Sequence, residues 1–120
     1  MARSTGAIVL GAGRVLFGVA MLAAPQAITR SWVGTEGTPS SVLLRCLAGR
    51  DIVIGGGLVL AAARGGDTRP WLAGGVLADT VDGISTLAGG DDIPSNGRIA
   101  TAALAGGAAL AGAYLASAID

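Results

Sequence analysis

The 120-residue sequence contains no histidine and only one cysteine, Cys46. Zinc, haem, iron–sulfur and copper sites are built mainly from these two residue types, so the usual ligands of such centres are missing. A lone cysteine also excludes a disulfide bond within the chain. We therefore expect no metal site and no cofactor, and we interpret Cys46 as a small buried apolar residue of a helix.

Lysine is also absent, since all eight basic residues are arginine, and eight acidic residues bring the formal net charge to zero. A chain without excess positive charge lacks the electrostatic footprint of nucleic-acid binding, so we expect no nucleic-acid partner. Aromatic residues make up only 3% of the chain. Trp32 and Trp71 lie at the ends of apolar runs, where indole rings favour the membrane interface, and we expect them to act as anchors there.

Apolar residues dominate what is present, at 52% of the chain and a mean hydropathy of +0.66. The length leaves room for one domain, residues 1–120. Four apolar runs have the roughly 20 residues that a helix needs to cross a bilayer, and glycine, proline and aspartate separate them. The expected spans are residues 6–24, 42–63, 71–88 and 99–119. The sequence thus predicts an all-α fold, a four-transmembrane-helix bundle.

Two other interpretations of these runs are weaker. The first run resembles a cleavable signal peptide, because Arg3 precedes it and small residues follow it, but Arg14 in its middle opposes that function. A soluble four-helix bundle needs a polar face on each helix. The last run offers only Thr101, Tyr114 and Ser117 for such a face, which favours a membrane protein.

Arginines near the ends of the runs predict the orientation. Four spans place both termini on one side, which carries Arg3, Arg64 and Arg69, whereas the opposite side carries Arg30 and Arg98 together with three acids. By the positive-inside rule, both termini are expected in the cytoplasm. The predicted location is the cell inner membrane, with the chain as a multi-pass protein.

Small residues at every fourth position predict the faces through which the helices pack. The stripes are Gly49, Val53 and Gly57; Gly75, Asp79 and Gly83; and Ala105, Ala109 and Ala113. Helices rich in glycine and alanine bury little volume. We therefore expect a homo-oligomer or a subunit of a larger membrane complex, assembled through the first or the last run.

Six charged residues lie inside the apolar runs, where an ionisable group costs at least a few kcal/mol unless it meets a partner or water. They are Arg14, Arg45, Arg50, Asp51, Asp79 and Asp82. Three positive and three negative charges can neutralise one another. We expect them to converge in the middle of the bundle as an ion network or a ligand-binding site.

Their spacing limits how they can pair. Asp79 and Asp82 are three residues apart and share a helix face, so either an arginine lies between them or one of them carries a proton. Arg50 and Asp51 are adjacent and point about 100° apart around the helix. That divergence predicts different partners for the two side chains.

Three functions fit such a cluster. It can hold the helices in register as a buried ion network, it can bind or transport a small ligand, an ion or a proton, or it can be catalytic. In the catalytic interpretation Asp79, Asp82 and Arg50 form an acid–arginine–acid group, in which one carboxylate takes a proton and the other gives one. Epoxide opening, cyclisation or isomerisation of a lipophilic small molecule would suit this group. The sequence leaves open whether the protein is an enzyme.

A further set of motifs extends over most of the chain. It comprises Ala12-Gly13-Arg14 with Gly18, Pro25, Trp32-Val33-Gly34, Arg45 with Gly49-Arg50-Asp51 and Gly55, and the stretch from Asp79 to Asp82. Together these motifs resemble a family of small four-pass bacterial membrane proteins of unknown function, which is distantly similar to DoxX-type four-helix proteins. The resemblance implies a helical membrane bundle and carries no catalytic role to any position.

The sequence therefore favours a binding or accessory membrane protein. Its expected partners are the lipid bilayer and a lipophilic small molecule at the charged cluster. A membrane-embedded enzyme acting on such a molecule is the alternative.

Overall fold

The structure is a computed structural model that describes residues 2–117, and these residues are almost entirely helical. The elements are α1 (Ala2–Ala23), α2 (Pro25–Trp32), α3 (Thr38–Ala63), α4 (Arg69–Ala88), the short 3-10 helix η1 (Gly90–Asp92) and α5 (Ser95–Ser117). The prediction of an all-α fold is confirmed. The last two residues of the expected span 99–119 lie outside the described residues.

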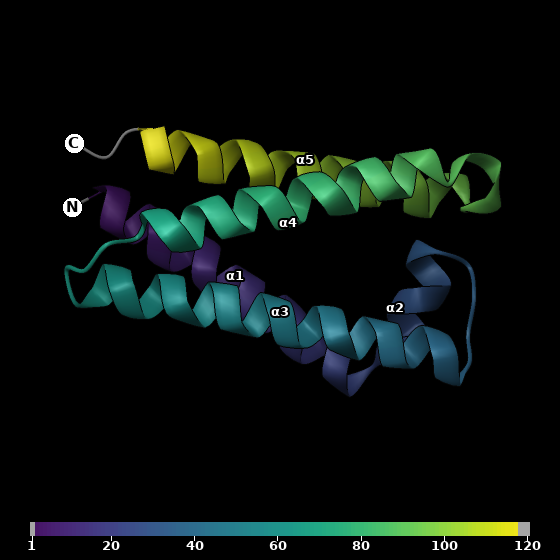
Figure 1. Cartoon of the computed structure of the whole chain (residues 1–120). Coiled ribbons are helices and arrows are strands. Elements are labelled where there is room, and N and C mark those ends of the chain that lie inside the picture. The colour runs from purple at the N-terminus through teal and green to yellow at the C-terminus, as the bar shows by residue number, and fades with distance from the viewer. Residues whose placement is uncertain (1, 118–120) are drawn as a thin grey trace.

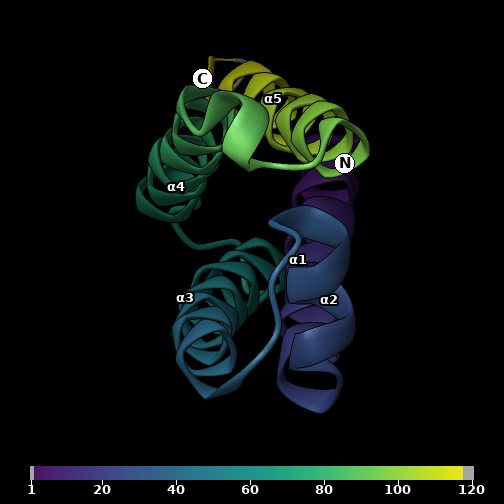
Figure 2. The same cartoon turned by 90° about the vertical axis from the view of Figure 1, so that its right-hand side faces the viewer.

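The four long helices run up and down one axis and form two layers. Figure 1 shows both ends of the chain and the α3–α4 loop at one end of the molecule, with α2 and η1 at the other. The view along the axis shows α1 beside α3 in one layer and α4 beside α5 in the other (Figure 2). The molecule measures 43 × 25 × 17 Å, and its long dimension exceeds the roughly 30 Å of a hydrocarbon core.

Three of these helices are long and apolar enough to cross a membrane: α1, α3 and α5. The helix α4 spans 20 residues, but it carries Arg69, Asp79 and Asp82 and does not reach the same apolar character. The predicted membrane character is therefore supported for three helices of the described chain. The predicted span 71–88 is thus a helix whose Asp79, Asp82 and Thr86 face its neighbours.

Two apolar cores lie toward opposite ends of the bundle. One contains Ala7, Leu58, Leu72 and Leu115, and the other contains Met21, Leu44 and Ala48. On α1, Arg14 lies between Ala7 and Met21, and on α3, Asp51 lies between Ala48 and Leu58. Arg14 and Asp51 therefore occupy a layer between the two cores, near the midpoints of their helices.

The helix α2 was not expected, because residues 25–41 read as a loop. Pro25 occupies the first turn of this helix, where its missing N–H costs nothing. Gly34, at a φ of +80°, ends it, and its N–H donates to the Thr29 carbonyl at 2.9 Å. The start of α5 packs closely against this end, since a side chain at Gly97 would collide with the Trp32 carbonyl.

The contact between α1 and α3 depends on two facing glycines. A Cβ atom at Gly55 would lie 2.5 Å from the Gly11 carbonyl oxygen, and one at Gly11 would lie 2.7 Å from the Gly55 carbonyl oxygen. Gly18 allows a similar approach to Ile52. Close packing of α3 against α1 around Arg14 thus depends on these glycines.

Of the predicted stripe Gly49, Val53 and Gly57 on α3, Gly57 packs against the Trp71 ring of α4, but the other two residues face outward. Val53 is exposed, and a Cβ at Gly49 would meet no atom within 4 Å. The buried face of α3 instead consists of Ser41, Leu44, Ala48, Asp51, Gly55 and Leu58. The spacing of small residues was therefore misleading here, because a larger set of residues at positions three and four apart forms the contact.

The predicted stripes on α4 and α5 differ from the α3 stripe in which way they face. On α4, Gly75 packs against the guanidinium group of Arg14 and Asp79 is buried, so this stripe faces inward. On α5, Ala105 is buried but Ala113 is exposed. The predicted α5 stripe therefore turns from the bundle interior to its surface along its length.

Candidate functional site

Five of the six charged residues form one continuous chain of ion pairs, in the order Asp79, Arg14, Asp51, Arg50, Asp82. Arg14 lies between two acids from different helices. Its Nη1 donates to Asp51 Oδ1 at 3.2 Å and its Nη2 donates to Asp79 Oδ2 at 2.5 Å. This arginine of α1 thereby links the two layers of the bundle.

Arg50 makes the second link, from α3 to α4. Its Nη1 and Nη2 donate to Oδ1 and Oδ2 of Asp82 at 2.9 and 2.7 Å, the two-pronged geometry in which arginine binds carboxylate best. Its Nε and Nη2 also donate to Asp51 Oδ1 at 3.2 and 3.1 Å. Asp51 is thus the central acid and accepts from both arginines.

The spacing predictions are met in part, since Arg50 binds Asp82 whereas Asp51 binds Arg14, so the two neighbours have different partners as expected. Arg50 and Asp51 do contact each other, because the arginine side chain is long enough to bend back over its neighbour. No single arginine lies between Asp79 and Asp82, since Asp79 binds Arg14 and Asp82 binds Arg50. The expected acid–arginine–acid group therefore contains Arg14 on one side and Arg50 on the other.

Arg45 does not join the network. It is exposed on α3, and within residues 2–117 the structure records no ion pair for it. Five residues separate Arg45 from Arg50, which turns the two side chains about 140° apart around the helix. Cys46 is likewise exposed and not buried as expected, because it lies on the same outer face of α3.

Glycines make room for the long arginine that joins the layers. A Cβ at Gly75 would lie 3.1 Å from Arg14 Nη2, and one at Gly55 would lie 3.0 Å from Arg14 Cβ. The Arg14 side chain can therefore cross from α1 over α3 to reach Asp79. Its exposed fraction is 8%, against 7% for Asp51 and 9% for Asp79.

An open groove of about 470 Å³ lies over this network, between α1 and α5. This volume falls within the range of small-molecule sites in proteins. Its charged floor consists of Arg14, Asp51, Asp79 and Asp82. Its apolar walls include Val9, Leu10 and Phe17 from α1, and Leu104, Ala105 and Ala108 from α5. The groove joins an apolar passage to buried charges.

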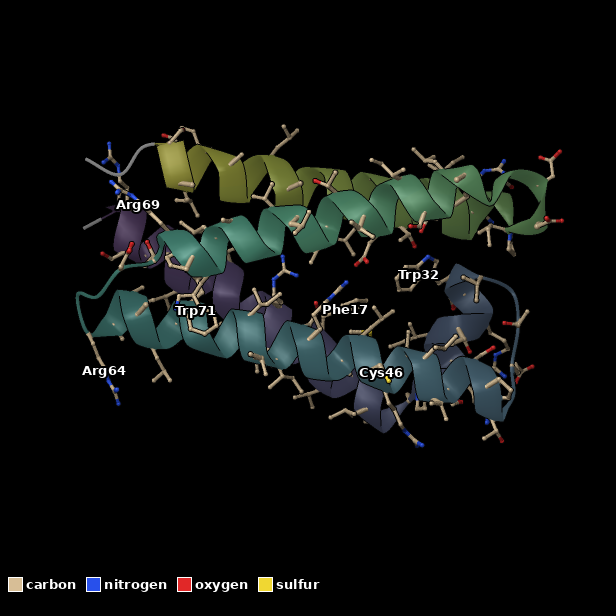
Figure 3. The ribbon with its side chains drawn as sticks, in the orientation of Figure 1. Phe17, Trp32, Cys46, Arg64, Arg69 and Trp71 are labelled. Atoms are coloured by element: carbon tan, nitrogen blue, oxygen red, sulfur yellow. The ribbon has the colours of Figure 1, made fainter. Side chains whose placement is uncertain are left out.

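Trp32 lines the groove and contacts α4, and its role as an interface anchor stays a prediction. Figure 3 shows its ring directed from α2 toward α4, where its Nε1 donates to Thr86 Oγ1 at 3.0 Å. Trp71 is also packed between helices, since its ring covers Gly57 of α3. Both tryptophans therefore hold the two layers together.

Sequence reasoning missed Phe17, Trp32 and Thr101 as residues of the groove. Their spacing gives no signal, because they come from three helices that are distant in sequence. Within residues 2–117 the structure contains no group of three or more acidic or thiol side chains placed to hold a metal ion. What the arrangement can do is hold a polar group against carboxylates, or exchange protons with it.

The chain matches no family model, no curated protein and no solved structure. The resemblance to small four-pass membrane proteins therefore stays a prediction, and the function must be argued from the groove and its charges.

Proposed function

We propose that this protein is a four-pass protein of the cell inner membrane that binds a small lipophilic molecule in the groove between α1 and α5. It then acts as a binding or accessory protein, and α4 is the fourth span. The observation that carries this proposal is the groove itself, where apolar walls from two apolar helices lead to four charged side chains. A molecule dissolved in the bilayer could enter between α1 and α5 and place a polar group on that floor.

The charges at the two ends support cytoplasmic termini. The end that carries both termini also carries Arg64 and the α3–α4 loop. At the opposite end, Arg30 pairs with Glu36 at 3.1 Å, and Arg98 donates to the Gly90 carbonyl. Three arginines, Arg3, Arg64 and Arg69, lie toward the terminal end against these two at the opposite end, and the positive-inside rule counts arginines.

Membrane integration gives the first testable expectation. The protein should remain in the membrane fraction after alkaline carbonate extraction, because three helices with mean hydropathies between 1.6 and 1.9 expose apolar faces. Immunoblotting of the pellet and supernatant measures this. Recovery as a soluble monomer without detergent would contradict the assignment.

Groove binding gives the second expectation. A neutral alkyl diazirine with a tert-butyl end, photolysed with the protein in lipid nanodiscs, should label the groove saturably. Mass spectrometry of peptides should locate the label near Phe17 and Leu104. Gly13→Trp should abolish this labelling, since a Cβ at Gly13 meets no atom within 4 Å and the indole can enter the groove it lines.

Gly49→Trp is the matched control, because Gly49 is an equally open glycine that does not line the groove. Its labelling should equal that of the unmodified protein. The proposed function would be wrong if the label spread evenly over outward residues such as Leu110 and Val19 and if Gly13→Trp did not change the labelling.

Catalysis is the second candidate, and the presence of three carboxylates along one groove favours it. One acid could take a proton from a bound lipophilic molecule while another gives one, with Arg14 and Arg50 holding both in place. Turnover of an epoxide or an isomerisable substrate, lost in Asp79→Asn and Asp82→Asn, would distinguish an enzyme from a binding protein.

We also propose that copies of the chain, or a larger complex, assemble through the open face of α5. A Cβ atom at Gly106 or Gly107 would meet no atom within 4 Å there, and Leu104, Leu110 and Tyr114 are exposed around them. Small residues beside large apolar ones form the kind of surface on which helices pack in lipid.

A further inference from the structure

The buried network carries an excess of negative charge. Three carboxylates face two guanidinium groups, which leaves one negative charge uncompensated when all five are ionised. Arg45, the residue that would balance it, is exposed on another face of α3. Of the described residues that line the groove, Arg14 is the one base among three acids. Unbalanced charge at this depth is costly, and either a proton on one acid or a positive group of a ligand can compensate it.

Two carboxylate oxygens in the groove lack a hydrogen-bond partner within residues 2–117. Asp51 receives its bonds on Oδ1, and Asp79 receives its bond on Oδ2. Oδ2 of Asp51 and Oδ1 of Asp79 stay available, on side chains that are more than nine-tenths buried and line the groove.

These two oxygens remain accessible from the groove. In the described part of the chain, Ser41 Oγ is the one completely buried side-chain nitrogen or oxygen without a hydrogen-bond partner. Neither of the two carboxylate oxygens is therefore completely buried. Polar groups in protein interiors normally have partners. A cationic group of a ligand would stabilise these two oxygens through its charge, with or without an N–H donor.

The walls of the groove decide what kind of cation fits. They are mostly aliphatic, which suits an apolar body and not a hydrated metal ion. The rings of Phe17 and Trp32 also line the groove, and aromatic rings attract organic cations through their π faces. Apolar walls, aromatic rings and excess acid together describe one class of ligand.

We propose that the groove selects lipophilic monocations, in which an ammonium group lies against Asp51 and Asp79 and an apolar body lies between α1 and α5. This inference rests on the groove-binding function proposed above and names the class of its ligand.

The test compares three alkyl diazirines of equal length that end in trimethylammonium, tert-butyl or carboxylate. The first two ends have the same shape and differ in charge. The protein is labelled in nanodiscs of zwitterionic lipid, and empty nanodiscs correct for the partitioning of each probe. We expect the ammonium probe to reach half-saturation at a concentration about tenfold lower than the tert-butyl probe. The carboxylate probe should bind more weakly than both.

Asp79→Asn should remove this preference, because it brings the network to two bases and two acids. The tert-butyl probe should still label the groove of this variant, which shows that the groove has folded. If Asp79→Asn does not fold, Asp82→Asn takes its place in the test, because it removes the same charge from a more exposed side chain. Asp92→Asn, in the exposed η1 segment, changes the net charge equally and should leave the preference intact.

The outcomes separate the two proposals. If the tert-butyl probe labels the groove and the ammonium probe shows no preference, the cation selectivity is wrong and groove binding stands. Preference retained in both Asp79→Asn and Asp82→Asn would also overturn the selectivity. If no probe labels the groove, the binding function itself fails.

Discussion

Replacing Arg14 by alanine is expected to destabilise the protein by about 3–5 kcal/mol, the range typical of breaking a buried ion pair from one side. The side chain is 8% exposed and bonds to Asp51 and Asp79 on two different helices. Its loss would leave three carboxylates with one guanidinium in the middle of the bundle. Thermal and denaturant unfolding of the detergent-solubilised protein measure the change.

Two arginines of α3 calibrate this result. Arg50→Ala should cost less than Arg14→Ala, because the Arg50 side chain is 27% exposed and water can replace part of its role. Arg45→Ala removes an arginine from the exposed face of the same helix and should change the free energy of unfolding by no more than about 0.5 kcal/mol. Equal losses in Arg14→Ala and Arg45→Ala would refute a stabilising network.

A double variant tests whether the residues act together. Arg14→Ala combined with Asp79→Ala should cost clearly less than the sum of the two single changes, because each single change leaves the other charge without its partner. Additive losses would mean that the 2.5 Å contact between Arg14 and Asp79 does not couple them energetically.

Gly55→Ala is expected to destabilise the protein by about 1–3 kcal/mol, the usual cost of overpacking an interior contact. The new methyl group would lie 2.5 Å from the Gly11 carbonyl and 3.0 Å from Arg14 Cβ, so α1 would have to move away from α3. That movement would also displace Arg14 from its acids. The same unfolding measurements apply.

The neighbouring glycine provides the control. A Cβ at Gly56 meets no atom within 4 Å, so Gly56→Ala should leave stability unchanged or raise it by up to about 1 kcal/mol through its helix propensity. Similar losses in both variants would mean that glycine matters here for reasons other than the close approach of α1.

The predictions for Arg14→Ala and Gly55→Ala both concern how the charged layer is held inside the bundle. A charged layer separates two apolar cores, and such a layer holds a bundle together only when its donors reach their acceptors. Gly55 and Gly75 provide the space in which Arg14 crosses between the layers. A groove above that crossing then presents the remaining charge to the region between α1 and α5.

Helix formation and the depth of the charges could be predicted from local sequence. Runs of about 20 apolar residues favour helices of membrane-spanning length whatever their neighbours are. The position of Arg14, Asp51 and Asp79 near the middle of those runs follows directly from counting residues. The prediction of a polar layer needs no knowledge of how the helices are arranged.

The pairing of the charges and the groove could not be predicted in this way. Periodicity gives the angle between two residues on one helix, but the rotation of that helix against its neighbours depends on contacts such as Gly11 with Gly55. That rotation turns Arg50 inward and Arg45 outward, and it brings Phe17, Trp32 and Thr101 to one groove. Local patterns thus predict helices and the depth of their charges, whereas side-chain packing between the helices selects which charges meet.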